Sequence, residues 1–307
     1  MLRVEEVETP RPGEGQVLVR IHAAGVNPAD TYARSGAGSA KPALPYTPGS
    51  DAAGVVESVG ARVTHVRPGE RVYTARTLTG TYAELALASE SQVHPLPERT
   101  SFEEGAALFV PYGTAYRALH QIARARRGET VLVHGASGGV GTAALQFGRA
   151  MGLTLFGTAG TNEGRELATR EGAHRVFDHH DPKYREAILE GSGGPGVDVI
   201  LEMLANVNLG HDLKLLAPHG RVVVIGSRGD VTITPRDLMF RDASIHAMLL
   251  WNVAPEDERE IHAAIATGLE AGDLRPVVGK RIPLAEAARA HREVLAPGAY
   301  GKIVLIP

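Results

Sequence analysis

The chain has 307 residues, enough for about two domains, and its 43% hydrophobic and 22% charged residues exclude a disordered protein. A net charge of −3 argues against a protein held on nucleic acid or anionic lipid by overall charge, and the absence of cysteine excludes disulfides, thiolate nucleophiles and cysteine-held zinc. Because the chain shows neither a signal peptide nor 18 consecutive apolar residues, we expect a cytoplasmic protein without a membrane span.

The first hundred residues have the pattern of a β-rich domain. Short segments of strand-like composition are separated by turns that contain glycine and proline. These segments are 16–26, 52–61, 70–75 and 81–88. Their shortness and spacing predict a partly closed β domain.

The character of the sequence changes after Phe102. In this segment the spacing of apolar residues predicts a helix from about Tyr112 to Arg127, which ends at Gly128. Three arginines fall at the expected helix end: Arg124, Arg126 and Arg127. Cations favour a helix C-terminus, so we interpret them as helix-stabilising charges rather than as a nucleic-acid patch.

From Thr130 onward the sequence alternates between strand and helix patterns. The expected strands are 131–135, 153–160, 175–179, 197–204, 220–227 and 244–250, with helices at 140–151 and 162–171. This rhythm predicts an α/β domain with a doubly wound parallel sheet. Two further helices, at 256–271 and 284–295, precede a closing strand at 301–307.

The sharpest motif is a small-residue loop between the first of these strands and its helix. It reads Ala136-x-Gly138-x-x-Gly141. Small residues let the backbone approach a pyrophosphate, Gly141 lets the helix pack closely on the strand, and the helix N-terminus offers unpaired N–H groups to phosphate. The motif therefore predicts a dinucleotide site that includes Ser137, Gly138, Gly139 and Val140.

The end of the second strand favours NADPH over NADH. An acidic residue normally binds the ribose 2′-hydroxyl of NAD about 20 positions after the glycines. Here Thr158, Ala159 and Gly160 occupy that place, and the first acid is Glu163. Arg228 and His179 are the candidate partners of a 2′-phosphate, with ordinary loop residues as the alternative interpretation.

Other kinds of site have weaker support. The histidine pair His179–His180 lacks the spacing of a metal-binding motif, so we expect no metal. No GxSxG segment is present, which argues against a hydrolase of that type.

Several segments in order along the chain resemble the zeta-crystallin-type quinone oxidoreductases, which are zinc-free medium-chain dehydrogenases/reductases. Residues that carry the family signature are Gly128, Glu129, Leu132, Ala136, Ser137, Gly138, Gly139, Gly141, Gln146 and Arg149. Further matching segments are 22–36, 41–60, 111–119, 202–209 and 225–229. The likeness extends over essentially the whole chain.

The resemblance implies a GroES-like β-rich catalytic domain with a Rossmann domain inserted into it. The expected boundaries are 1–106 for the N-terminal part of the catalytic domain, 107–254 for the cofactor domain and 255–307 for the return to the catalytic domain. Expected NADPH contacts are Tyr32, Ser137, Gly138, Gly139, Val140, Gly160, His179, Asn208, Ile225, Gly226, Ser227, Arg228, Met248, Leu249 and Leu250. Family members usually open with a further β-segment before the part that matches residues 2–4, so we expect the edge of the catalytic sheet to differ here.

The resemblance also implies the reaction, which is NADPH-dependent reduction of a quinone or a related electrophile in the cleft between the domains. Asn27 and Tyr32 would face the nicotinamide and the substrate as catalytic residues. Two alternatives are a 2-alkenal or enoyl-thioester reductase on the same fold, and a nucleotide-bound structural or RNA-binding protein. The apolar segment 244–250, expected at the last strand of the sheet, predicts a homo-oligomer, either a dimer or a tetramer.

Overall fold

The computed structural model describes residues 2–37 and 42–307, so that Lys41, which opens the matching segment 41–60, lies outside them. The chain divides into two compact units. Unit 1 comprises Met1–Val110, Arg275–Pro297 and Gly301–Pro307, and unit 2 comprises Pro111–Leu274 and Gly298–Tyr300. The α/β fold class is confirmed, but the structure groups residues 255–274 with unit 2, whereas the sequence boundaries assigned them to the catalytic domain.

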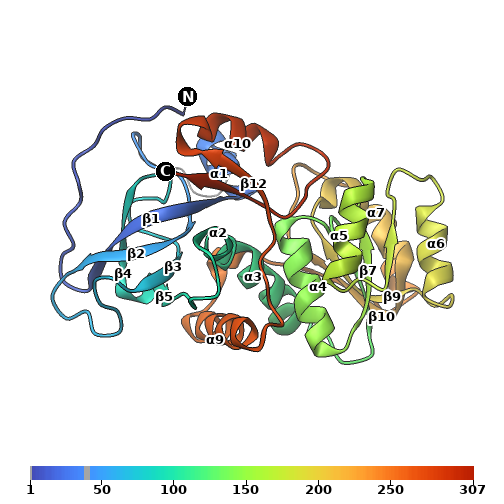
Figure 1. The fold of residues 1–307 in the computed structure, drawn as a ribbon. Helices are drawn as coiled ribbons and strands as arrows, with labels where there is room; N and C mark the ends of the chain where they lie inside the picture. Colours follow the sequence, from blue (N-terminus) through green and yellow to red (C-terminus); the bar gives the residue numbers. More distant parts are fainter. Residues whose placement is uncertain (1, 38–41) are drawn as a thin grey trace. The chain divides into compact units, whose positions relative to one another are not determined.

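Unit 1 is built around a 7-stranded sheet of order β12-β13-β1-β2-β3-β5, with β4 paired to β1. Its strands are β1 Gln16–Val26, β2 Asp51–Val59, β3 Arg71–Ala75, β4 Leu85–Ser89, β5 Val93–Pro95, β12 Val278–Pro283 and β13 Lys302–Ile306. The last strand of the chain, β13, runs antiparallel to the first, β1, so the red and blue ends of the sequence meet in one sheet (Figure 1). Because strand side chains alternate between two faces, the inward valines and alanines of β1, β2 and β4 form one buried core.

Short helices complete unit 1. They are α1 Pro28–Ser35, α2 Phe102–Gly105 and α10 Ala287–Glu293, with 3₁₀ turns η1 Glu90–Gln92 and η4 Leu284–Glu286. Helix α1 follows directly from β1: Asn27 is its N-cap, Pro28 opens its first turn, and Gly36 ends it with φ 74°. Asn27 is therefore held at the junction of a strand and a helix.

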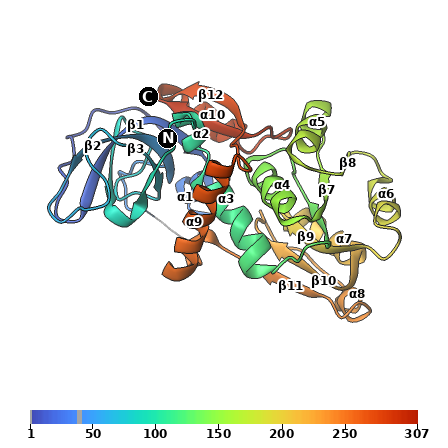
Figure 2. The same cartoon turned by 60° about the horizontal axis from the view of Figure 1, so that its bottom comes forward.

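Unit 2 contains a 6-stranded parallel sheet of order β11-β10-β9-β6-β7-β8, of which β7 to β11 are labelled in Figure 2. The strands are β6 Thr130–Val133, β7 Thr154–Thr158, β8 Arg175–Phe177, β9 Val197–Glu202, β10 Leu216–Val224 and β11 Ser244–Ala247. The direction of strand order reverses between β6 and β9, and ligands of such sheets bind beyond the carboxyl ends of the strands at this point. The expected doubly wound sheet is confirmed.

Helices cover both faces of this sheet. They are α4 Gly139–Met151, α5 Asn162–Glu171, α6 Tyr184–Gly191, α7 Ala205–Leu215 and α8 Pro235–Met239. Helices α4 and α5 contact each other over β6–β8, and α6 and α7 contact each other over β8–β10. Because crossovers between parallel strands are right-handed and the strand order reverses at β6, the two pairs lie on opposite faces.

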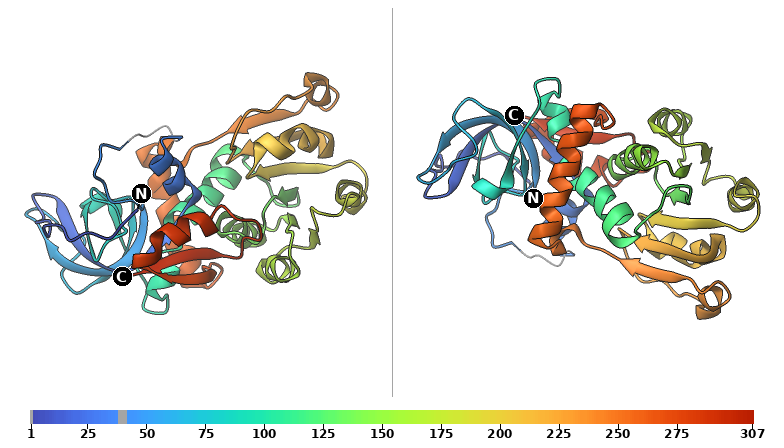
Figure 3. Two further views of the ribbon diagram at one scale, coloured as in Figure 1. Left: turned by 90° about the horizontal axis from the view of Figure 1, so that it is seen from above. Right: turned by 90° about the horizontal axis from the view of Figure 1, so that it is seen from below.

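The remaining helices of unit 2 pack side by side. Helix α3 Phe109–Tyr116 continues into the π-helical turn η2 Arg117–Ile122, while η3 Leu250–Asn252 leads to α9 Pro255–Ala271. Gln121 Nε2 donates to the Asp257 carbonyl over 3.0 Å, which joins η2 to the start of α9. The long orange helix α9 and the green helix α3 are neighbours in both views of Figure 3. In the described part of the chain, no helix is both long and apolar enough to cross a membrane.

Several expected elements have different bounds in the structure, and three of them differ most clearly. The helix expected to reach Arg127 stops at Ile122, and Arg124 has φ 50°, so the three arginines follow the helix rather than forming its last turn. Segment 81–88 becomes a strand only from Leu85. Segment 244–250 becomes a strand only to Ala247, because Leu250 turns inward and packs against Gly113 and α9.

Candidate cofactor and active site

The loop after β6 has the compact geometry that a dinucleotide site requires. A Cβ atom at Gly141 would lie 2.7 Å from the backbone of Ala136, closer than real Cβ contacts, so only glycine fits there. Gly138 is the N-cap of α4, which leaves the first N–H groups of the helix available to an anion. Ser137, within the loop, is buried, and its hydroxyl donates to the Ala299 carbonyl over 2.6 Å. The residues therefore fit a pyrophosphate at the helix N-terminus.

The end of β7 brings together the residues expected to select the cofactor. A Cβ at Gly160 would lie 2.8 Å from Nε2 of His179 and 2.7 Å from Nε2 of His180, so both imidazoles lie beside this glycine. Arg165, which sequence analysis did not consider, donates to Asp178 over 2.8 Å and also reaches the Ala159 carbonyl at 3.5 Å. The site is thus surrounded by cationic or ionisable nitrogen groups, and the nearby Asp178 carboxylate is paired with Arg165.

The ends of β9 and β10 are tied to each other. Ala205 N–H donates to the Gly226 carbonyl over 2.9 Å, and Arg228 N–H donates to Asn206 Oδ1 over 2.8 Å. This pairing brings residues 205–206, on the same helix as Asn208, next to 226–228; that these residues contact NADPH stays a prediction. Of the expected contacts beyond β11, Met248 donates its N–H to Val224, whereas the Leu250 side chain is buried in the interior of unit 2.

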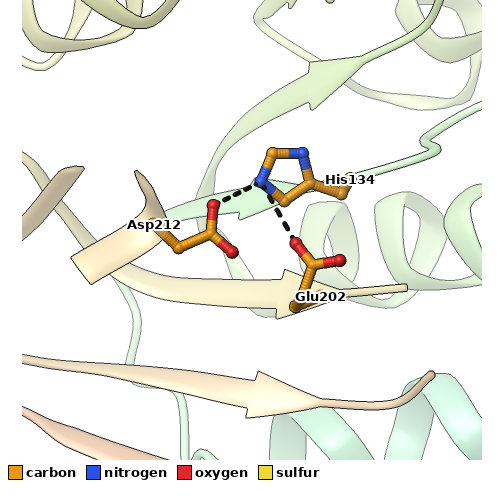
Figure 4. Close-up of side chains that lie close together, drawn as sticks. All are labelled: His134, Glu202 and Asp212. Atoms are coloured by element: carbon orange, nitrogen blue, oxygen red, sulfur yellow. Dashed lines mark hydrogen bonds and ion pairs between the residues drawn. The ribbon is translucent and has the colours of Figure 1, made fainter. Parts of the chain in front are cut away.

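Beneath these loops lies a buried cluster of one imidazole and two carboxyl groups, which sequence analysis missed. His134 follows β6, Glu202 ends β9 and Asp212 belongs to α7 (Figure 4). His134 Nε2 lies 2.9 Å from Asp212 Oδ1 and 3.5 Å from Glu202 Oε2, and His134 Nδ1 lies 3.2 Å from Thr158 Oγ1. All three side chains are at most 5% exposed.

The members of this cluster shift one another's pKa values. Burial lowers the pKa of His134, but the charge and hydrogen bond of Asp212, together with the charge of Glu202, more than offset it and raise the pKa to about 8. Burial raises the pKa of Glu202 to about 8; His134 opposes this rise, and the Asp212 charge and hydrogen bond add to it. Two members of the cluster, His134 and Glu202, therefore have pKa values raised to about 8.

Residues of these types can also bind metal ions, and ligand atoms of His134, Glu202 and Asp212 lie within 4.8 Å of one another. Hydrogen bonding accounts for the arrangement without an ion, because His134 Nε2 at 2.9 Å from a carboxylate carries a proton rather than a free lone pair. The expectation that the protein needs no metal stays a prediction.

In unit 1, Asn27 is buried, and each polar atom of its side chain has a hydrogen-bond partner. Lys302 Nζ donates to Asn27 Oδ1, and Asn27 Nδ2 donates to Asp51 Oδ2 over 3.0 Å. Lys302 Nζ also lies 2.9 Å from Asp51 Oδ2, and Asp51 Oδ1 accepts the Val110 N–H over 2.9 Å. Asp51 and Lys302 come from β2 and β13, so two strands on either side of β1 fix the orientation of one amide.

A second polar chain adjoins Asn27. The backbone N–H of Asn27 donates to Asp30 Oδ2 over 2.8 Å, and the Tyr82 hydroxyl donates to the same oxygen over 3.1 Å. Burial raises the pKa of Asp30 to about 6, and this rise outweighs the hydrogen bond from Asn27. Tyr32, the other expected catalytic residue, lies half-buried on α1. The backbone of Asn27 thus caps helix α1, and its side chain belongs to the ion-pair network; the catalytic role of Asn27 and Tyr32 stays a prediction.

Comparisons with known proteins identify the family. Residues 13–98 match the alcohol dehydrogenase GroES-like domain, and residues 139–267 match the domain described as zinc-binding dehydrogenase. A quinone oxidoreductase of Homo sapiens is 49% identical over 302 residues, which cover 98% of this chain and 92% of the human protein.

Solved structures with the same fold include oxidoreductases described with different cofactors. The structure of Escherichia coli quinone oxidoreductase complexed with NADPH has a TM-score of 0.89 at 29% identity and covers 99% of this chain and 95% of its own. An NAD-dependent alcohol dehydrogenase has a TM-score of 0.92 at 28% identity over the same shares of both chains. Fold, loop geometry and near-complete alignment agree, and the chain belongs to the quinone oxidoreductase family of zinc-free medium-chain dehydrogenases/reductases.

Proposed function

We propose that this protein is an NADPH-dependent quinone oxidoreductase. The observation that carries the proposal is 49% identity to a quinone oxidoreductase over 98% of the chain, together with a dinucleotide loop of the required geometry. When bound, the nicotinamide supplies a hydride or electrons to the acceptor. The chain supplies binding and orientation: the α4 N-terminus holds phosphate, and Asn27 and Tyr32 orient the acceptor and the carboxamide.

The direct experiment is a panel of acceptors with NADPH, followed by the absorbance of the cofactor. We expect quinones to be reduced with higher kcat/KM than 2-alkenals or enoyl thioesters. An enone or thioester as the best acceptor would instead support the alternative reductase. Binding without turnover of any acceptor would support a structural protein. The expectation of a cytoplasmic location stays a prediction.

We expect a clear preference for NADPH over NADH. Arg165, His179 and His180 gather at Gly160, and a charge-assisted hydrogen bond to phosphate contributes about 1.5–3 kcal/mol, or roughly 10- to 150-fold. Gly160→Asp adds a carboxylate there and should shift the preference towards NADH. Gly160→Ala adds a Cβ without charge. It therefore separates steric crowding of the cofactor from repulsion between a carboxylate and the 2′-phosphate. Equal kcat/KM with both cofactors in the unmutated protein would contradict the preference.

Substitution of the proposed catalytic residues should misplace the reacting atoms without abolishing the chemistry. One neutral hydrogen bond contributes about 0.5–1.5 kcal/mol, so Asn27→Ala and Tyr32→Phe should each lower kcat/KM by roughly 3- to 15-fold at saturating NADPH. Asn27→Ala also removes the partner of Lys302, so its rate is compared at equal folded fraction. A 1,000-fold loss in Tyr32→Phe would instead make Tyr32 a proton donor.

We further propose a homo-oligomer formed through β11. This strand is an edge of the unit 2 sheet, His246 and Ala247 on it are exposed, and an open strand edge can pair with a second copy. Light scattering at micromolar concentration should give at least a dimer mass. His246→Lys should reduce it to the monomer, whereas Leu78→Lys, at an exposed apolar site in unit 1, should not. A monomer mass for the unmutated protein would refute this interface.

A further inference from the structure

The buried cluster of His134, Glu202 and Asp212 holds more carboxylate oxygens than hydrogen-bond donors. Glu202 Oε1 accepts the Leu204 N–H and Asn208 Nδ2, and Asp212 Oδ1 faces His134. Glu202 Oε2 and Asp212 Oδ2 are both buried and accept no hydrogen bond from a donor, although Glu202 Oε2 lies at ion-pair distance, 3.5 Å, from His134 Nε2. An ionised carboxylate can only accept hydrogen bonds, so two ionised groups here would leave both oxygens unpaired and repelling each other.

We propose that Glu202 keeps a proton at neutral pH, shares it with Asp212, and in this form positions the 203–208 segment for NADPH. One added proton supplies a donor for the two unpaired oxygens and leaves His134 and Asp212 as an ion pair of zero net charge. The proposal rests on the proposed function, because it concerns binding of the same cofactor.

Glu202 is placed to organise both loops expected to contact the cofactor. Its side chain holds Leu204 and Asn208, and its backbone carbonyl accepts the N–H groups of Ile225 over 2.8 Å and Gly226 over 3.2 Å. The ties between Ala205 and Gly226 then join the two loops. Glu202 is thus a positioning residue, which acts on NADPH through Asn208.

The groups that face Glu202 come from several elements. They are His134 at the end of β6, Asp212 and Asn208 on α7, and the Tyr184 hydroxyl on α6, with His179 after β8 acting on His134. The burial and the Asp212 charge that raise the pKa of Glu202 favour the protonated form, and only His134 among the charged members favours ionisation.

The experiment compares Glu202→Gln, Glu202→Ala and the control Glu190→Gln, which changes an exposed carboxyl group on α6. The Kd of NADPH is measured by cofactor fluorescence from pH 7 to 9.5. Glutamine keeps the side-chain oxygen that accepts from Leu204 and Asn208, and it replaces the shared proton by an N–H donor. The Kd of NADPH at pH 7 should therefore stay within about 3-fold of that of the unmutated protein. Alanine loses two hydrogen bonds, and binding should weaken by about 10- to 100-fold.

The pH profile separates positioning from general structural support. Glu202→Gln also removes a charge that raises the pKa of His134, so a loss of affinity at high pH is assigned to Glu202 only where it follows the same pH dependence as the acid band described next. Infrared difference spectra between pH 7 and 10 should contain the carbonyl band of a protonated carboxylic acid. This band should vanish in Glu202→Gln and persist in Glu190→Gln.

Three results would overturn the proposal. The first is an unchanged infrared spectrum in Glu202→Gln. The second is a loss of NADPH affinity beyond about 30-fold in Glu202→Gln at pH 7 with an unchanged Tm, which would mean that the ionised form is required. The third is stoichiometric metal whose removal by a chelator abolishes NADPH binding. Failure of the unmutated protein to bind NADPH would refute the proposed function instead, and the infrared band would still test the shared proton.

Discussion

Lys302→Met is expected to destabilise unit 1 by about 3–5 kcal/mol and to lower quinone reduction further by releasing Asn27. Lys302 and Asp51 are each at most 5% exposed, and removal of one partner of a buried ion pair leaves the other charge without compensation. The free energy of unfolding, followed by circular dichroism in urea, measures the first effect, and kcat/KM at equal folded fraction measures the second.

The controls for this experiment come from the same part of the chain. Lys280→Met removes a lysine whose side chain is 60% exposed and paired with Glu293, and it should cost no more than about 1 kcal/mol. Lys302→Met combined with Asp51→Asn removes both charges and should recover part of the stability. If Lys302→Met unfolded at the same urea concentration as Lys280→Met, the ion pair would not stabilise the unit.

Gly141→Ala is expected to weaken NADPH binding strongly. The added methyl group meets the Ala136 backbone at 2.7 Å, so α4 must move away from the loop and carry its N-terminal amides out of place. Overpacking of this kind costs about 1–3 kcal/mol, or roughly 5- to 150-fold in Kd. Fluorescence titration with NADPH measures the change, and circular dichroism establishes that the variant is folded.

The matched control is Gly210→Ala on α7. A Cβ atom there would have ordinary contact with Thr232 O at 3.5 Å, and alanine is the better helix former. This variant should bind NADPH as tightly as the unmutated protein and unfold at the same or a higher temperature. Equal affinities for Gly141→Ala and Gly210→Ala would show that the close packing at Gly141 does not control the site.

The strands and helices that were predicted from the sequence are those that a local pattern of residues determines. The parallel strands of unit 2 were expected from apolar runs followed by helices, and α4 begins at Gly139, beside its motif. Helix α1 was missed because eight residues provide too little periodicity against the strand pattern of β1. The helix expected to reach Arg127 stops earlier because Arg124 adopts a left-handed backbone conformation, which no repeat of apolar residues reveals.

The structure brings together the expected cofactor residues where they follow neighbouring strands. Gly138, Gly160 and His179 follow consecutive strands of the sheet, so topology alone brings them to one edge. Lys302 is 275 residues from Asn27 and 251 from Asp51, and no spacing rule connects a lysine near the end of the chain to an amide near its beginning. His134, Glu202 and Asp212 were missed for the same reason, because each alone has the pattern of an ordinary strand or helix residue.

The pairing of β13 with β1 also orders events during synthesis of the chain. Unit 2 is nearly continuous in sequence, so a ribosome releases Pro111–Leu274 while the end of the chain is still being made. The sheet of unit 1 must wait for Lys302–Ile306, which covers one side of β1 and delivers the ammonium group to Asn27. During that interval the β13 side of β1 is exposed without its partner strand, so the burial of Asn27 depends on translation of the full-length chain.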